Sequence, residues 1–153
     1  MSIFEISINS EESLLKSFDF LHDASCNQED VKYDQEKGTL DIIFNRDFLE
    51  DPTKITTRRV FLIFHEFEFP IVKSYLHLES LMSCKIFSND KSLTRDTFTE
   101  CKKKKNKYIL WFNLGLEIEL DFKSSINGYL RDVEFVHGKT GSFMHFKSKL
   151  KNM

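Results

Sequence analysis

Apolar and polar residues alternate along most of the chain, most clearly in its final third. From residue 116 to residue 122 the sequence LEIELDF has an apolar residue at every second position and an acidic residue at each position between. Successive side chains of a strand point to opposite faces, so this segment predicts one apolar and one solvated face. Residues 107–113, KYILWFN, precede it across a turn at Leu114 and Gly115. Together the two segments predict a β-hairpin.

Similar patterns predict the other strands. A hairpin is predicted from residues 30–34 and 39–45, joined by a turn in which Gly38 supplies a positive φ. Further strands are predicted at residues 2–8, 58–69, 71–78, 83–88 and 128–136. The segment 58–69 is apolar on both faces, which is typical of a strand that is central or covered by a helix. Residues 89–106 are mostly polar and predict a loop region.

One short helix is predicted near the N-terminus, at residues 9–21. Asn9 or Ser10 can cap it, and the acidic residues that follow are favourable in a first helical turn. Its buried stripe would consist of Leu14, Leu15 and Phe18. The predicted fold is therefore α+β and mostly β: a curled or two-layer antiparallel sheet of about seven or eight strands with one helix.

Composition narrows the class of protein. The 153 residues fit a single domain, 1–153, with a loose tail from about residue 138. The chain has 16 Phe but only 5 Gly and 2 Pro, which favours a packed core over disorder. A formal charge of −2 gives no general attraction to nucleic acids or membrane surfaces. The charged residues also interrupt every apolar stretch well before it reaches membrane-spanning length.

The cysteines indicate a reducing compartment. Cys26, Cys84 and Cys101 are odd in number and form no C-x-x-C motif, so neither a zinc site nor a redox pair is indicated. The N-terminus has no basic segment followed by an apolar run, so no signal peptide is predicted. We therefore expect a cytoplasmic protein without a cofactor.

Two stretches resemble small bacterial β-rich domains. FLHDASCNQEDVKYDQEKGTLDIIF, residues 20–44, is similar to their opening, with Leu-His-Asp-Ala before a strand. YILWFNLGLEIELDF, residues 108–122, is similar to a later segment in which a glycine separates two strands. Some of these domains are proposed to be immunity proteins that neutralise toxins delivered by contact. The resemblance implies a β-rich single domain and no particular reaction.

Two pairs of residues are candidates for chemistry. His22 and Asp23 could act as a general base with an orienting carboxylate, or as metal ligands. The alternative is a structural corner in which Asp23 accepts backbone hydrogen bonds, since adjacent residues of an extended chain need not meet. His65 and Glu66 lie in FHEFEF, which alternates like a strand and lacks the second histidine of H-E-x-x-H. A hydrolytic or metal-binding site would combine His22, Asp23, His65 and Glu66.

The run of Lys102, Lys103, Lys104 and Lys105 is the strongest local charge. Such a run can bind phosphate, so a nucleic-acid-binding module is an alternative. However, no aromatic residue is interleaved for base stacking, and acidic residues elsewhere offset the charge. The run is therefore interpreted as a solvated loop that also protects a neighbouring strand edge.

The favoured function is a non-enzymatic protein-interaction domain, and toxin neutralisation is the version that the resemblance implies. Its partner would be another protein, in contact with a sheet face or with the acidic loop around residues 47–51. Acidic groups there would suit a basic partner such as a nuclease. An exposed sheet edge would also allow a homodimer. The sequence identifies neither the partner nor the biological process.

Overall fold

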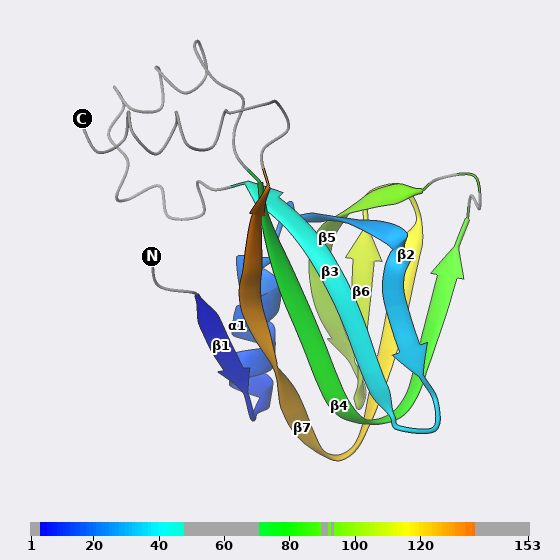
Figure 1. Ribbon diagram of the computed structural model, residues 1–153. Helices are drawn as coiled ribbons and strands as arrows, with labels where there is room; N and C mark the ends of the chain where they lie inside the picture. Colours follow the sequence, from blue (N-terminus) through cyan, green and yellow to red (C-terminus); the bar gives the residue numbers. More distant parts are fainter. Residues whose placement is uncertain (1–3, 48–70, 90–91, 93, 137–153) are drawn as a thin grey trace, which may run out of the picture.

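The computed structural model describes residues 4–47, 71–89, 92 and 94–136, which form a mostly antiparallel β structure with one short helix (Figure 1). The predicted fold class is confirmed. In chain order the described elements are β1 (Glu5–Ile8), α1 (Glu11–Phe20), β2 (Ser25–Asp34), β3 (Thr39–Asp47), β4 (Ile71–Ser88), β5 (Arg95–Lys104), β6 (Lys107–Phe112) and β7 (Leu116–Val136).

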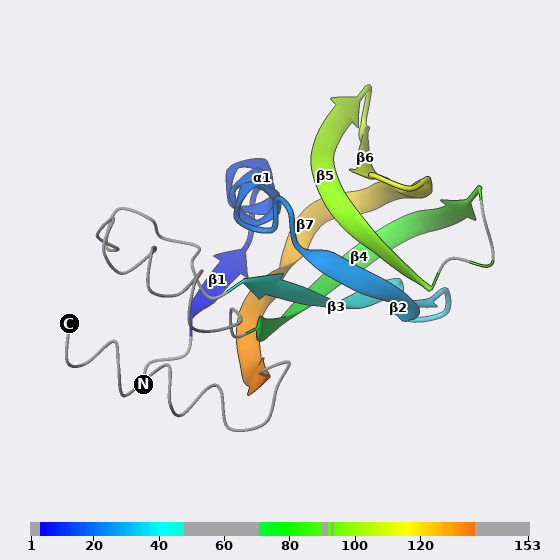
Figure 2. The same cartoon turned by 90° about the horizontal axis from the view of Figure 1, so that it is seen from above.

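The sheet closes into a barrel. Its strand order is β1-β7-β4-β3-β2-β5-β6, and β6 also pairs with β7, so the sheet returns on itself. Every strand pair within it is antiparallel. Strand β1 adds to the second half of β7, and α1 lies beside these strands (Figure 2). Closure explains how a sheet of this size protects most of its edges.

Two long, bent strands make the closure possible. Strand β4 has 18 residues, and Ser80 near its middle has a φ of 61°. Its first half pairs with β3 and the end of β7, whereas its second half pairs with the beginning of β7. The prediction of separate strands at 71–78 and 83–88 is therefore wrong, and the strand predicted at 128–136 is the end of β7. The backbone continues between these segments through bulges.

Strand β5 corrects another prediction, because the polar sequence of residues 89–106 predicts a loop and residues 95–104 form a strand. The inward-facing residues of β5 include only one large apolar side chain, Phe98, so the sequence lacks the usual alternation. Asp96 is 2% exposed, and its carboxylate accepts backbone N–H groups of Thr97, Leu114 and Leu116 at 2.8, 2.8 and 3.0 Å. A buried carboxylate satisfied in this way anchors the turn between β6 and β7.

The helix and the hairpin turn form as predicted. Ser10 caps α1 in a reciprocal capping box with Ser13, and Leu14 and Phe18 are buried against the barrel. Gly38 has a φ of 65° in the turn between β2 and β3. In the core, Phe18 lies 5.8 Å from Phe98 between ring centroids. Aromatic packing therefore joins the helix to β5.

Some predictions fall outside the described residues. These are the strand at 58–69, the acidic loop at 48–51 and the tail from about residue 138. In the part of the chain that the structure describes, no helix is long and apolar enough to span a membrane.

Candidate functional site

A row of polar and aromatic side chains crosses the outer face of the sheet. In the strand register, Tyr129 of β7 lies opposite His77 of β4, and His77 lies opposite Asp41 of β3. The flanking residues of these strands, such as Leu76 and Ile42, are fully buried. Because side chains alternate, His77 and its cross-strand neighbours point away from the core. We call Asp41, Tyr75, His77, Glu79 and Tyr129 the outer-face network.

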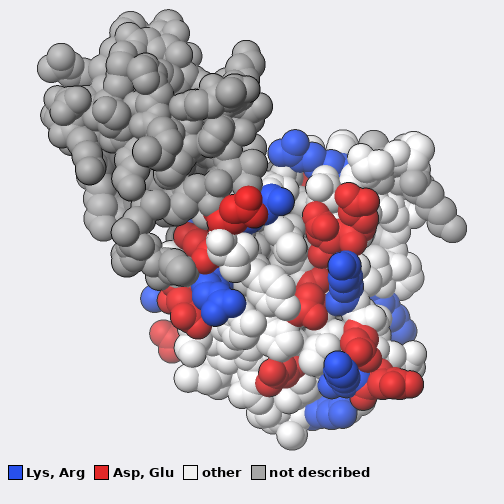
Figure 3. All heavy atoms as spheres, in the orientation of Figure 1, with Lys and Arg blue, Asp and Glu red and all other residues white. Residues whose placement is uncertain are grey.

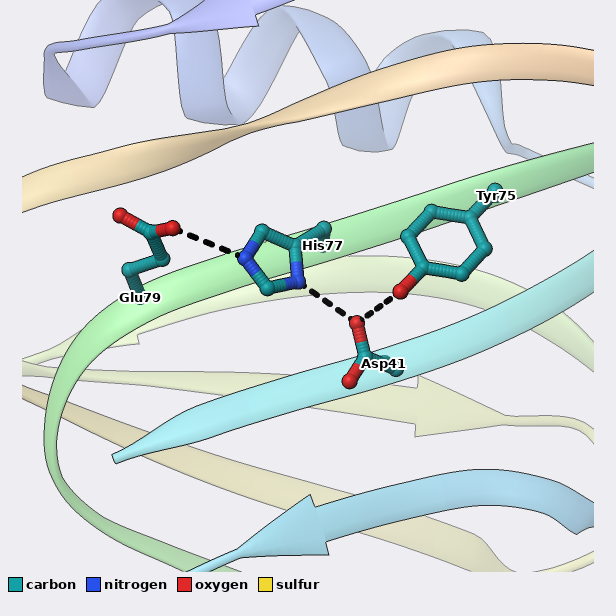
Figure 4. A network of polar contacts seen from close by, with 4 residues as sticks. All are labelled: Asp41, Tyr75, His77 and Glu79. Carbon is teal, nitrogen blue, oxygen red and sulfur yellow. Dashed lines mark hydrogen bonds and ion pairs between the residues drawn. The ribbon is translucent and has the colours of Figure 1, made fainter. Parts of the chain in front are cut away.

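Hydrogen bonds hold the histidine from both sides (Figure 4). Nδ1 of His77 lies 2.6 Å from Oδ1 of Asp41, and Nε2 lies 3.0 Å from Oε1 of Glu79. The hydroxyl of Tyr75 donates to the same Asp41 oxygen. The side chain of His77 is only 17% exposed, compared with 31% for Asp41 and 55% for Glu79. The imidazole is therefore fixed, while the outer carboxylate remains accessible.

The aromatic rings of the network pack against one another. The ring of Tyr129 lies 5.8 Å from that of Tyr75 and 5.2 Å from the imidazole of His77, measured between centroids. The guanidinium carbon of Arg131 lies 5.3 Å from the centroid of Tyr129. These contacts combine stacking with a cation–π interaction across β4 and β7. They group half-buried rings on one face of the sheet, with charged groups beside them.

Two pKa shifts follow from this arrangement. Burial lowers the pKa of His77, but hydrogen bonds and charges from Asp41 and Glu79 outweigh burial, and the pKa lies above its ordinary value. Burial is the largest cause of a raised pKa at Tyr75, and its hydrogen bond to Asp41 adds to the effect. The network therefore favours a protonated imidazole and a neutral phenol.

This geometry does not suit acid–base catalysis by His77. A general base needs an unprotonated nitrogen directed at the substrate. Here a carboxylate occupies each ring nitrogen, so the imidazolium form has both of its N–H groups satisfied. Within the described ranges, no group of three or more His, Cys, Asp or Glu residues could hold a metal ion. The network is better suited to holding a rigid surface.

His22 and Asp23 come together at the corner between α1 and β2. Nε2 of His22 lies 3.5 Å from Oδ1 of Asp23, and Nδ1 lies 2.6 Å from the carbonyl oxygen of Thr99. Asp23 has a φ of 69°, and its backbone N–H donates to the carbonyl of Phe98 at 2.9 Å. The backbone, rather than the carboxylate, thus fixes the corner to β5. Both side chains are mostly exposed, at 60% and 78%.

The other two candidates, His65 and Glu66, lie outside the described residues, so the structure does not relate them to His22 and Asp23. The sequence pattern marks His77 and Glu79 only as near neighbours on one strand. Their partner Asp41 is 36 residues away from His77, and only the register between β3 and β4 brings them together.

The lysine run lies at the end of β5 and in the turn that follows, where it forms ion pairs and ring contacts. Nζ of Lys102 lies 3.7 Å from Glu100 and 4.5 Å from the ring centroid of Trp111. Nζ of Lys103 lies 2.8 Å from Glu11 of α1. The loop interpretation holds for Lys105, whereas Lys102, Lys103 and Lys104 belong to the strand. Aromatic residues do lie beside the run, because Lys102 contacts the ring of Trp111 and Lys103 contacts that of Tyr108.

Taken together, the fold and the network define a mostly-β barrel with one capped helix and a rigid, polar–aromatic sheet face. Comparison of the chain with known protein families, with curated proteins and with solved structures found no match.

Proposed function

We propose that this protein is a non-enzymatic interaction domain that binds a protein partner through the outer face of β7, β4 and β3. The observation that carries the proposal is the His77 imidazole, held between Asp41 and Glu79 and packed against Tyr129. A side chain fixed in this way cannot act as a free base, but it supports a surface of constant shape.

Rigid tyrosine and arginine side chains favour binding. Tyrosine and arginine are enriched among the residues that dominate binding energy at protein interfaces. Tyr75, Tyr129 and Arg131 already contact one another across two strands, so a partner would not have to order them. This pre-organisation lowers the entropic cost of association.

The charge of this face suits a basic partner. Among the residues that the strand register places on this face, carboxylates outnumber cations. The acidic residues are Glu5, Asp34, Asp41, Glu79 and Glu134, and the basic residues are Lys32, Lys73 and Arg131. Figure 3 views the same side as Figure 1 and shows acidic and basic groups spread over the described surface, with uncharged areas between them. An acidic excess would steer a basic protein toward the aromatic centre.

A toxin is the specific partner that the resemblance to bacterial immunity proteins suggests. A basic nuclease toxin would match the charge of the outer face. Co-expression tests this version: the chain should restore growth to cells that produce the toxin encoded beside its gene. If a variant that lacks the network neutralises the toxin equally well, the toxin binds to another surface of this protein.

Affinity capture with a matched pair of variants tests the interaction surface. Tyr129→Ala with Arg131→Ala removes the centre of the face, whereas Lys123→Ala with Ser125→Ala changes exposed residues of the same strand. We expect the wild type and the Lys123/Ser125 control to retain the same basic protein. The Tyr129/Arg131 variant should lose at least about tenfold in affinity, equivalent to 1.4 kcal/mol.

Equal retention by all three proteins would overturn the proposal, and so would retention of no partner by the wild type. Circular dichroism of each variant would show whether the barrel remains folded. A turnover that depends on His77 would instead favour an enzyme.

A further inference from the structure

A second surface carries two exposed aromatic rings on either side of a carboxylate. In the register of the barrel, Phe87 of β4 lies opposite Glu117 of β7, and Glu117 lies opposite Trp111 of β6. The next residues along β7 and β6, Ile118 and Leu110, are fully buried, so this row faces outward. Phe87 is 48% exposed and Trp111 is 36% exposed. Both rings are therefore accessible to a ligand, and exposed apolar side chains that lie together can mark a binding site.

The carboxylate between the rings differs from the neighbouring carboxylates in its contacts. Its neighbours are paired: Glu119 lies 3.0 Å from Nζ of Lys107, and Glu100 lies 3.7 Å from Nζ of Lys102. In the part of the chain that the structure describes, the half-buried side chain of Glu117 makes no hydrogen bond or ion pair. A carboxylate between apolar rings gains most from a cation that replaces its lost water.

The space around this row can accept a ligand group. An open hollow of about 540 Å³ is lined by Phe87, Trp111 and Glu117. The polar residues at its rim are Asn89, Thr99 and Asn113. The ring of Trp111 already holds a cation, since Nζ of Lys102 lies 4.5 Å from its centroid. The protein itself therefore already places a cation beside this indole ring.

We infer that Phe87, Glu117 and Trp111 form a clamp that binds the guanidinium group of an arginine side chain presented by a partner peptide. A guanidinium is planar, so its faces stack on aromatic rings while its edge donates two hydrogen bonds to one carboxylate. An ammonium group is a point charge and cannot make both contacts in the same way. Asn89 and Asn113 also line the hollow, and their amides can bind the backbone of the peptide.

The clamp is separate from the outer-face network. It involves the second half of β4 with the beginning of β7, whereas the network involves the first half of β4 with the end of β7. Substitutions in one surface therefore leave the contacts of the other unchanged. The inference stands or falls independently of the proposed outer-face partner.

Intrinsic fluorescence provides a direct test, because Trp111 is the single tryptophan of the chain. The probe is the blocked tripeptide acetyl-Gly-Arg-Gly-amide, and the comparison peptides contain citrulline or lysine in place of arginine. Citrulline has the shape of arginine without its charge. We expect the arginine peptide to change the fluorescence saturably, the lysine peptide to bind more weakly, and the citrulline peptide to have little effect.

Two carboxamide variants locate the binding site. Glu117→Gln removes the charge of the clamp, and Glu119→Gln removes that of the next outward carboxylate on the same strand. We expect the Glu117 variant to lose affinity by about tenfold and the Glu119 variant by less than about twofold. Phe87→Leu, which keeps an apolar side chain but removes the ring, should also weaken binding. Equal binding of arginine and citrulline peptides, or unchanged affinity in the Glu117 variant, would overturn the inference.

Discussion

Arg46 and Asp132 form an ion pair on the core side of the sheet, with 2.6 Å between Nη2 of the arginine and Oδ2 of the aspartate. Ser74 lies between them: its hydroxyl donates to Asp132 and accepts from Nε of Arg46. The arginine side chain is 5% exposed, and its guanidinium carbon lies 4.4 Å from the ring centroid of Phe20. The pair thus connects β3, β4 and β7 to the helix.

Asp132→Ala should destabilise the barrel strongly. It leaves a buried guanidinium without its carboxylate, which typically costs about 3–5 kcal/mol. The measurement is the free energy of unfolding in urea. Glu134→Ala, on the same strand but exposed, should change it by less than about 0.5 kcal/mol. Replacing Arg46 and Asp132 together by leucine should recover much of the loss, because no charge then remains buried. If the double variant is no more stable than Asp132→Ala, this explanation is wrong.

Substitution of Gly128 by alanine should destabilise the barrel. It lies where β7 crosses between β1 and β4, and a Cβ built there would approach the carbonyl oxygen of His77 to 2.0 Å. Both backbones belong to the paired sheet, so a Cβ at this position forces the strands to shift. Gly128→Ala should therefore lower the free energy of unfolding by about 1–3 kcal/mol or more. Thermal unfolding compared with Ser125→Ala on the same strand would test this. Equal melting temperatures would show that the strands can move apart at this crossing.

The three cysteines should react slowly in the native protein. Burial is the main cause that raises the pKa of each thiol, Cys26, Cys84 and Cys101, to about 12. The thiolate is the reactive form, so little of it exists near neutral pH. Ellman's reagent at pH 8 should modify the thiols only as fast as the barrel opens, and in urea all should react promptly. Rapid modification of one native cysteine would identify a reactive thiol instead.

The sequence predicted the elements whose signal is local. The hairpin of β6 and the start of β7 follows from the alternation of residues 116–122, and Gly38 marks the turn of the other hairpin. The helix follows from its cap at Ser10. In each case the residues that determine the structure lie within a few positions of one another, so propensity and pattern suffice.

Features that depend on long-range register could not be predicted. Barrel closure requires β4 and β7 each to pair over two halves, and no local pattern distinguishes a bent strand from two short ones. The strand β5 was missed because its core position at 96 is filled by a buried aspartate rather than an apolar residue. The outer-face network was missed because Asp41 and His77 meet only through the pairing of β3 with β4.

The stability contributed by His77 should depend on pH. Its pKa is raised above 6.5 in the folded state, so the imidazolium form is favoured by folding. This contribution is therefore fully present below the unfolded-state pKa of about 6.5 and is lost as pH rises through the folded-state pKa. The charged groups that contact the ring are Asp41 from β3 and Glu79 from its own strand. Tyr75 and Tyr129 pack beside it, and Arg131 of β7 lies over the ring of Tyr129. The two carboxylates act in favour of the charged form.

His77→Gln should thus reduce the free energy of unfolding more at pH 5.5 than at pH 8.5, both measured in urea, because glutamine keeps a hydrogen-bonding side chain but cannot take up the proton. Nuclear magnetic resonance of the imidazole protons gives the folded-state pKa directly. Asp41→Asn should lower that pKa, because it removes the closest negative charge, 2.6 Å from Nδ1. A His77 pKa at or below 6.5 in the wild type would show that burial outweighs the carboxylates. A stability difference that does not change with pH would show that His77 contributes through packing alone.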